Sequence, residues 1–278
     1  DIQPDGTECV VTVINGKAYM KPIVLELGDE KYALWTDVIT AIETAKESET
    51  EYTVKLLDDT NIGAFKLPKA GTYGKLTVSY DSKTLTFTGS ITLTGKLAVT
   101  NTNISPEKSS SRYTISTGKY AFTAENADLG LAGISGTGDV TLKKAKTTGT
   151  VKAANLDLSE TDIGAVTVSG TLALNGGNAV SGAVTAGTLD LGGTNTIKGN
   201  VIVNGVLTLN GVNTVFGTIK ANELGSTEDG AKLNILSNAS GVMSVTKNGI
   251  TGGSKNITIK LIDSEENAVQ AAASMTIA

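Results

Sequence analysis

Apolar residues recur at a fixed step in the stretch from Val166 to Leu224. Three near-copies read VTVSGTLALNGGNAVSGA, VTAGTLDLGGTNTIKGN and VIVNGVLTLNGVNTVFGT, and a fourth begins IKANEL. Four columns keep a step of 17 or 18 residues: Val166, Val184, Val201 and Ile219; Leu172, Leu189, Leu207 and Leu224; Leu174, Leu191 and Leu209; and Val180, Ile197 and Val215. Such a shared period is typical of repeat proteins, in which each unit buries its apolar face by stacking on its neighbours.

Like residues at a one-coil spacing predict parallel strands, because an antiparallel meander gives no reason for a constant period. Strands are expected near 166–168, 172–174 and 179–181, which gives three faces to each coil. A left-handed hexapeptide helix needs an aliphatic residue at every sixth position, and the gaps here are uneven. Since parallel crossovers are right-handed in about 98% of cases, we predict an all-β fold, a right-handed parallel β-helix.

Polar and small residues in the repeat keep the same step. Asn178, Asn195 and Asn213 follow the Leu-x-Leu strands, and stacked asparagines can bond side chain to side chain in a ladder. Glycines mark two corners, where we expect either a positive φ or a close backbone approach. They are Gly170, Gly187 and Gly205 at one corner, and Gly182, Gly199 and Gly217 at the other.

Outside the repeat, the strand pattern is looser. From Tyr52 onward, apolar residues alternate with Thr, Ser or Lys, as expected for strands with one buried face. The step from Leu76 to Leu97 is 21 residues, so the early coils should be wider, with a gradual narrowing along the chain. Residues 100–125 interrupt the rhythm, and 101–113 are expected to form a protruding loop that could carry binding determinants.

The N-terminal region contains the one convincing helical pattern. Thr36 and Asp37 are expected to cap a helix over about 36–47, whose apolar residues share one face. We predict that this helix plugs the open N-terminal end of the solenoid, and a helix lying on the flank would contradict this hypothesis. Before it, Asn15-Gly16 predicts a β-hairpin.

We therefore expect one structural domain with four parts. Residues 1–33 form N-terminal strands packed on the solenoid, and 34–50 contain the capping helix. Residues 51–262 form the coils, and 263–278 form a final strand or another cap.

Composition narrows the core and the partners. The 278 residues are 40% hydrophobic but only 4% aromatic, which predicts a narrow aliphatic core without room for large aromatics. The net charge is −5 and no basic cluster stands out, which argues against nucleic acid and an anionic membrane surface as partners. No run approaches the roughly 20 apolar residues of a membrane helix. Cys9 is the single cysteine, so no disulfide can form within the chain. We expect a monomer without a cofactor.

Two aspartates are the candidate catalytic residues. Asp157, Ala173, Asp190 and Thr208 occupy the outward positions between the stacked leucines. If they stack, Asp157 and Asp190 lie roughly 9.6 Å apart at the usual strand spacing, near the upper end of the range of about 6.5–9.5 Å in inverting glycosidases. No His or Arg is near them in sequence, so we favour solvated surface carboxylates.

Other acidic residues were considered as calcium ligands. Asp58, Asp59 and Asp139 lack the dense alternation of carboxylates found in calcium loops, so we interpret them as turn residues and predict no metal site.

The run KYALWTDVITAIETAKESETEYTVKLLDD, from Lys31 to Asp59, resembles a recurring segment of adhesin-like bacterial cell-surface proteins. The matching positions are Tyr32, Leu34, Val38, Ala41, Ile42, Ala45, Val54, Leu56, Leu57 and Asp59. The sequence has SETEYT where that family tends to have Gly-Asp-Thr. The resemblance implies a pectin-lyase-like β-helix fold and a location outside the cell.

The leading functional hypothesis is a non-catalytic extracellular β-helix module of a bacterial surface protein, secreted or held at the cell surface. It would act as an adhesin-like binding surface or a rigid stalk, with an extracellular glycan or a host or bacterial surface protein as partner. Two alternatives stay open. One is a polysaccharide lyase or glycoside hydrolase, and the other is a carbohydrate-binding module that uses the 100–125 loop.

Overall fold

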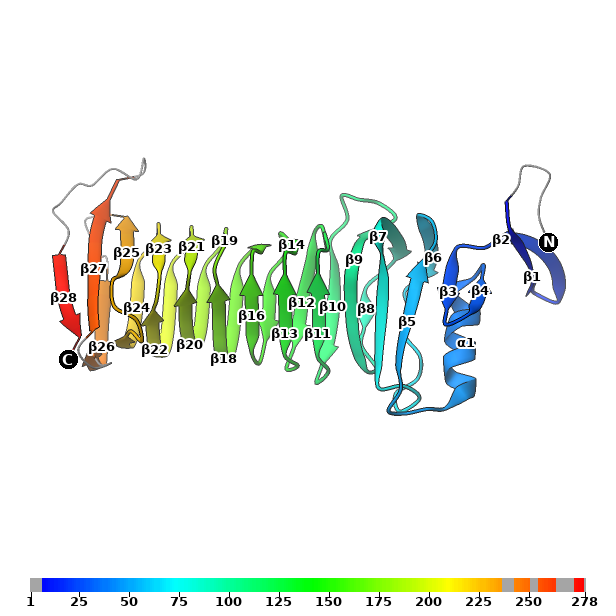
Figure 1. Cartoon of the computed structure of the whole chain (residues 1–278), viewed down its shortest axis with the longest axis horizontal. Helices are drawn as coiled ribbons and strands as arrows, with labels where there is room; N and C mark the ends of the chain where they lie inside the picture. Colours follow the sequence, from blue (N-terminus) through cyan, green and yellow to red (C-terminus); the bar gives the residue numbers. More distant parts are fainter. Residues whose placement is uncertain (1–6, 237–242, 251–254, 264–272, 278) are drawn as a thin grey trace. The chain divides into compact units, whose positions relative to one another are not determined.

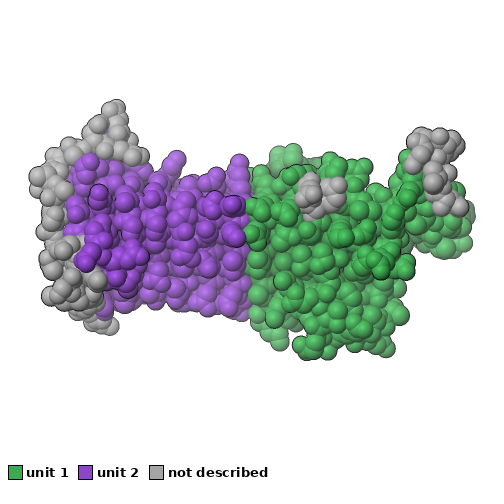
Figure 2. All heavy atoms as spheres, viewed as in Figure 1, with its two compact units in different colours: residues 1–131 green, residues 132–278 purple. Residues whose placement is uncertain are grey.

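The computed structural model describes residues 7–236, 243–250, 255–263 and 273–277. The chain divides into two compact units, Asp1–Leu131 and Ala132–Ala278 (Figure 2). Parallel coils of β-strands stack within each unit, as the repeat predicts (Figure 1). The right-handed winding and the single structural domain stay predictions.

Unit 1 begins with two antiparallel hairpins. β1 (Cys9–Ile14) and β2 (Lys17–Pro22) form a separate two-stranded sheet around the predicted Asn15-Gly16 turn. β3 (Leu25–Leu27) pairs with β4 (Glu30–Tyr32) and also runs antiparallel to β5 (Glu51–Leu56), the first strand of the coils. The second hairpin thus occupies the sheet edge that the first coil would otherwise expose.

The helix lies at the predicted end of the coils, but it begins differently. α1 (Trp35–Ala45) has Leu34 as its N-cap without a side-chain hydrogen bond, so the predicted cap by Thr36 and Asp37 is wrong. Asp37 instead accepts a hydrogen bond of 3.1 Å from the Thr12 hydroxyl. The buried face of α1 comprises Trp35, Val38 and Ile42.

Two hydrogen bonds attach α1 to the segment that follows β6 (Thr60–Ala64). The Trp35 indole donates to the Lys66 carbonyl at 2.7 Å, and the Lys69 amide donates to the Glu43 carboxylate at 2.9 Å. In Figure 1 the helix stands beside β3 and β4 at the N-terminal end of the coils. Its position is that of a cap over the first coil rather than a support along the flank.

The coils of unit 1 are wide. The paired residues are 24 apart from Tyr52 to Leu76, 21 from Leu76 to Leu97 and 25 from Leu97 to Phe122, so the wider early coils are confirmed. The steps do not fall gradually, and the predicted gradual narrowing is wrong. The remaining strands of this unit are β7 (Lys75–Thr88), β8 (Ile91–Thr92), β9 (Lys96–Pro106), β10 (Tyr113–Gly118) and β11 (Phe122–Glu125).

A row of aromatic rings fills part of the unit 1 core. Trp35, Phe65, Phe87 and Tyr113 meet edge to face, with successive centroids 5.2, 5.7 and 4.9 Å apart. All four are at most 4% exposed. The prediction of an aliphatic core without large aromatics is therefore wrong for unit 1, because longer coils enclose a wider cross-section.

The coils of unit 2 match the repeat. Leu172, Leu189, Leu207 and Leu224 lie in register in neighbouring coils, and so do the other predicted columns. Among the described residues of this unit, the buried hydrophobic side chains are all Ala, Val, Leu or Ile. The prediction of an aliphatic core holds here.

Each regular coil of unit 2 contributes strands to two sheets. The strands are β12 (Ala132–Gly136), β13 (Val140–Lys143), β14 (Lys146–Thr147), β15 (Val151–Ala153), β16 (Leu156–Ser159), β17 (Asp162–Ile163), β18 (Val166–Asn175), β19 (Asn178–Val180), β20 (Val184–Gly192), β21 (Thr194–Ile197), β22 (Val201–Leu209), β23 (Val212–Val215), β24 (Ile219–Gly225), β25 (Ala231–Leu236), β26 (Met243–Ile250), β27 (Lys255–Ile262) and β28 (Ala273–Ile277). Two of the three predicted faces are continuous in β18, with a shift of register between Val168 and Thr171. β28 runs antiparallel to β27, and residues 264–272 of the predicted C-terminal cap lie outside the described residues.

The corner glycines are required by close backbone approach. None of the six has a positive φ. A Cβ added at Gly199 would lie 2.4 Å from the carbonyl carbon of Gly182 in the preceding coil, and one at Gly187 would lie 2.4 Å from the Ser169 oxygen. Successive corners are therefore stacked too tightly for any side chain.

Candidate functional site

The two candidate catalytic aspartates share one outward column of unit 2. Asp157 pairs with Ala173, and Ala173 pairs with Asp190, so two coils separate the carboxylates, roughly 9.6 Å at the usual spacing. Asp157 is exposed, and its carboxylate accepts a hydrogen bond of 2.6 Å from the Asn175 amide. The register thus brings the two aspartates onto one face, with an alanine between them.

The three candidate ladder residues form a continuous hydrogen-bonded row inside unit 2. The Asn178 amide donates to the Asn195 side-chain oxygen at 2.8 Å, and the Asn195 amide donates to the Asn213 oxygen at 2.8 Å. Each is at most 3% exposed. The Asn178 oxygen accepts from the Thr161 amide at 3.0 Å, so the row also satisfies turn backbone. Its role is structural.

The acidic residues considered for calcium hold turns instead. The Asp58 carboxylate accepts from the Asp59 amide at 2.8 Å, and that bond together with Lys83 lowers the pKa of Asp58. Asp59 accepts from the Thr84 amide, and Asp139 accepts from the Asn155 amide group. Across the described residues, no group of three or more Cys, Asp or Glu side chains is placed to hold a metal ion.

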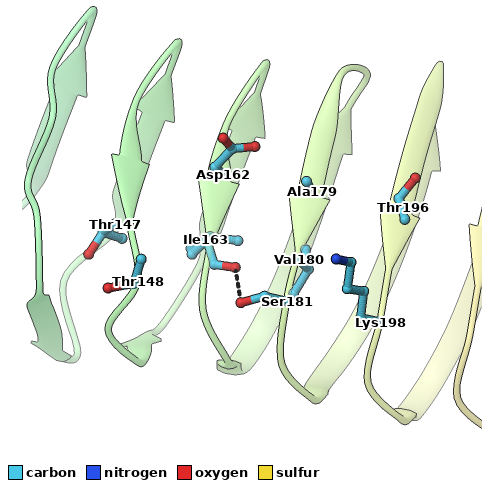
Figure 3. Close-up of a pocket in the computed structure, with 9 residues that line it drawn as sticks. All are labelled: Thr147, Thr148, Asp162, Ile163, Ala179, Val180, Ser181, Thr196 and Lys198. Carbon is cyan, nitrogen blue, oxygen red and sulfur yellow. Dashed lines mark hydrogen bonds between the residues drawn. The ribbon is translucent and has the colours of Figure 1, made fainter.

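A hollow of about 270 Å³ lies on the second sheet of unit 2, over β14, β17, β19 and β21. We call it the flank hollow (Figure 3). Its lining consists of Thr147, Thr148, Asp162, Ile163, Ala179, Val180, Ser181, Thr196 and Lys198. Sequence reasoning did not single out this site.

The hollow results from a small residue in an outward column. Asp162 pairs with Ala179, and Ala179 pairs with Thr196, so the three side chains point outward from successive coils. The Ala179 methyl group leaves a gap between its longer neighbours. In the column, the change from Asp to Ala to Thr is the signal from which the hollow could have been predicted.

The walls of the hollow differ in charge. Asp162 stands on one side and Lys198 on the other, and both are exposed (Figure 3). The Ser181 hydroxyl donates to the Ile163 carbonyl at 3.1 Å, and its oxygen remains available as an acceptor. An acceptor wall, a donor wall and an apolar floor together suit a ligand with hydroxyl groups around an apolar face.

Comparisons with protein-family models, with curated proteins and with solved structures gave no match. Of the helical residues that the structure describes, none belongs to a helix long and apolar enough to cross a membrane.

Proposed function

We propose that the chain is a non-catalytic, extracellular β-helix module of a bacterial surface protein, with an adhesin-like binding surface on a rigid stalk. The stacked coils and the buried asparagine ladder support the stalk, because each coil is hydrogen-bonded to the next along its strands and at its turn. The resemblance of Lys31–Asp59 to adhesin-like proteins supports the location outside the cell.

The flank hollow is the observation that carries the binding role. Its size suits one or two sugar rings rather than a protein surface. In the proposed complex, the Asp162 carboxylate accepts hydrogen bonds from sugar hydroxyls, and the Lys198 ammonium group donates to ring or hydroxyl oxygens. The apolar face of the ring lies over Ala179. The ligand class is therefore a neutral glycan segment.

A hollow-filling variant tests this role. Ala179→Phe should weaken binding to neutral oligosaccharides by on the order of tenfold or more, because the ring occupies the space of the ligand. Thr214→Phe is the matched control, since Thr214 continues the same outward column beyond the hollow. A glycan array followed by calorimetry on the positive oligosaccharides supplies the measurement. Unchanged binding by Ala179→Phe would contradict the assignment of the site.

The enzyme alternative rests on the shared column of Asp157 and Asp190. An inverting hydrolase would use one carboxyl group as acid and the other as base across the intervening coil. Incubation with a panel of neutral and acidic polysaccharides, with reducing ends as the readout, decides between the two functions. Turnover by the wild type that disappears in Asp157→Asn and Asp190→Asn would refute the non-catalytic proposal.

A further inference from the structure

A second surface hollow lies in unit 1, around the loop between β9 and β10. Two adjacent hollows of about 360 and 550 Å³ share Thr88, Gly89 and Ser90, so together they form one groove. Further lining residues are Phe65, Lys66, Thr92, Thr94, Lys108, Ser111 and Arg112. We call this surface the loop groove.

The loop itself is shorter than the sequence predicts. Asn101 to Pro106 continue β9 and pair with β7, so only residues 107–112 leave the sheet. In Figure 1 this loop extends beyond the ends of the neighbouring strands. The Glu107 amide donates to the Phe87 carbonyl at 2.9 Å, and the Ser111 amide donates to the Lys108 carbonyl at 2.8 Å. These bonds hold the loop in a defined turn beside the groove.

The loop groove is positively charged on a protein of net charge −5. Lys66, Lys108 and Arg112 are all exposed, and within the described part of the chain none of them forms an ion pair. The one carboxylate among the lining residues, Glu107, accepts a hydrogen bond of 2.5 Å from the Asn61 amide. Three cations therefore share the groove with one carboxylate, and that carboxylate is already engaged.

Hydroxyl groups accompany the cations. Thr88, Ser90, Thr92, Thr94 and Ser111 line the groove, and the exposed Thr88 and Thr92 can bond to sugar hydroxyls. The ligand that this lining fits carries anionic groups at intervals along a hydroxylated chain. The groove is also larger than the flank hollow, as an oligomer requires.

We propose that the loop groove binds a segment of an anionic glycan, with Lys66, Lys108 and Arg112 contacting its sulfate or carboxylate groups. This inference rests on the proposed function only in taking a glycan as the ligand class. The site, the unit and the charge of the ligand all differ from those of the flank hollow.

The test measures binding of the whole protein to dextran sulfate, polygalacturonate and unmodified dextran by biolayer interferometry. We expect at least one of the two anionic polymers to bind, dextran to bind weakly or not at all at this groove, and affinity to fall as sodium chloride rises. The polymer that binds more tightly identifies sulfate or carboxylate as the anionic group. Equal binding of all three polymers would overturn the proposal.

Charge variants locate the site. The triple variant K66Q/K108Q/R112Q should lose on the order of tenfold or more in affinity for the anionic polymer, because each cation supplies a charge-assisted hydrogen bond. The control K146Q/K152Q/K220Q removes the same charge from exposed positions of unit 2 and should retain wild-type affinity. An equal loss in both would show that net charge alone governs binding and would overturn the site.

Two further comparisons define the ligand class. Lys108→Glu should weaken binding more than Lys108→Gln, since it adds repulsion to the loss of attraction. If single-stranded DNA or polyglutamate binds as tightly as the anionic glycans, the groove recognises charge alone and the glycan assignment is wrong. The variants of the loop groove leave Ala179 intact, so the test of the flank hollow with neutral glycans decides the proposed function separately.

Discussion

Units 1 and 2 are both stacks of parallel coils, yet they are filled and held together differently. The coils of unit 1 take 21 to 25 residues from Tyr52 to Phe122, and an edge-to-face aromatic row lies in their core. The regular coils of unit 2 take 17 or 18 residues, and their core consists of stacked aliphatic columns with a buried asparagine ladder.

The difference shows how coil length determines what a solenoid can carry. A short coil leaves space only for small side chains, so identical residues stack on one another and the flank stays regular. A longer coil needs large rings to fill its cross-section, and it has residues to spare for loops. This is why the cationic loop groove lies in unit 1 and the shallow flank hollow in unit 2.

The largest expected effect comes from opening the aromatic row. Phe87 is fully buried and contacts both Phe65 and Tyr113, so Phe87→Ala should cost about 3–5 kcal/mol of unfolding free energy. Phe87→Leu should cost less, because it leaves a smaller cavity. Urea unfolding gives the free energy, and hydrogen exchange should show lost protection in unit 1. Equal loss of protection in unit 2 would break the comparison.

The second effect comes from interrupting the ladder of unit 2. Asn195→Ala removes bonds to Asn178, to Asn213 and to the Gly192 carbonyl, and it leaves buried polar groups unpaired. We expect a loss of about 2–4 kcal/mol, since each unsatisfied group costs about 1–3 kcal/mol.

The exposed Asn175 provides the ladder control, because its amide bonds only to the surface carboxylate of Asp157 among the contacts seen here. Asn175→Ala should change thermal stability by less than about 0.5 kcal/mol. If the two asparagine variants unfold at the same temperature, the ladder does not hold unit 2 together.

A third effect probes the tight corners of the short coils. Gly199→Ala would place a Cβ 2.4 Å from backbone of Gly182 and should cost about 1–3 kcal/mol through displaced coils. Gly192→Ala is the matched control, because its nearest contacts would be at an ordinary 3.7 Å and its φ is not positive. Circular dichroism melting of both variants is sufficient. A control as unstable as Gly199→Ala would contradict the argument from close approach.

The smallest effect is a pH dependence confined to unit 1, since all seven tyrosines precede residue 132. Burial raises the pKa of the Tyr113 hydroxyl, and the Asp128 carboxylate raises it further. The neutral hydroxyl donates to the Leu129 carbonyl at 2.8 Å. Because the folded pKa lies above the unfolded value of about 10, this contribution is fully present below about pH 10 and is lost as pH rises further.

Hydrogen exchange at increasing alkaline pH checks this dependence. Unit 1 should lose protection relative to unit 2 above about pH 10. Tyr113→Phe should be less stable by about 1 kcal/mol at neutral pH through the lost hydrogen bond, but its alkaline decline should be shallower. A decline as steep as that of the wild type would assign the effect to other groups.

The sequence predicted best where the repeat is strict. The leucine columns, the asparagine row and the shared face of Asp157 and Asp190 follow directly from a step of 17 or 18 residues, because parallel stacking aligns residues one coil apart. The helix was predicted from its apolar face. Its N-cap was predicted wrongly, because Asp37 bonds to Thr12, a residue 25 positions away in the chain.

Neither hollow was predicted as a site. The flank hollow depends on the small Ala179 between the outward side chains of Asp162 and Thr196, which only the register of β17, β19 and β21 brings together. The loop groove depends on Lys66 approaching the loop that contains Arg112, although more than forty residues separate them in sequence. Irregular coils have no period from which such neighbours can be read.

The sequence by itself thus determined the all-β class, the parallel stacking and the register of unit 2, since periodic burial allows few other arrangements. Only the tertiary structure decided where the aromatic residues gather, which carboxylates are engaged and where the surface is hollow. These features depend on side chains from different coils with unequal lengths, and their positions are fixed only when the whole stack is packed.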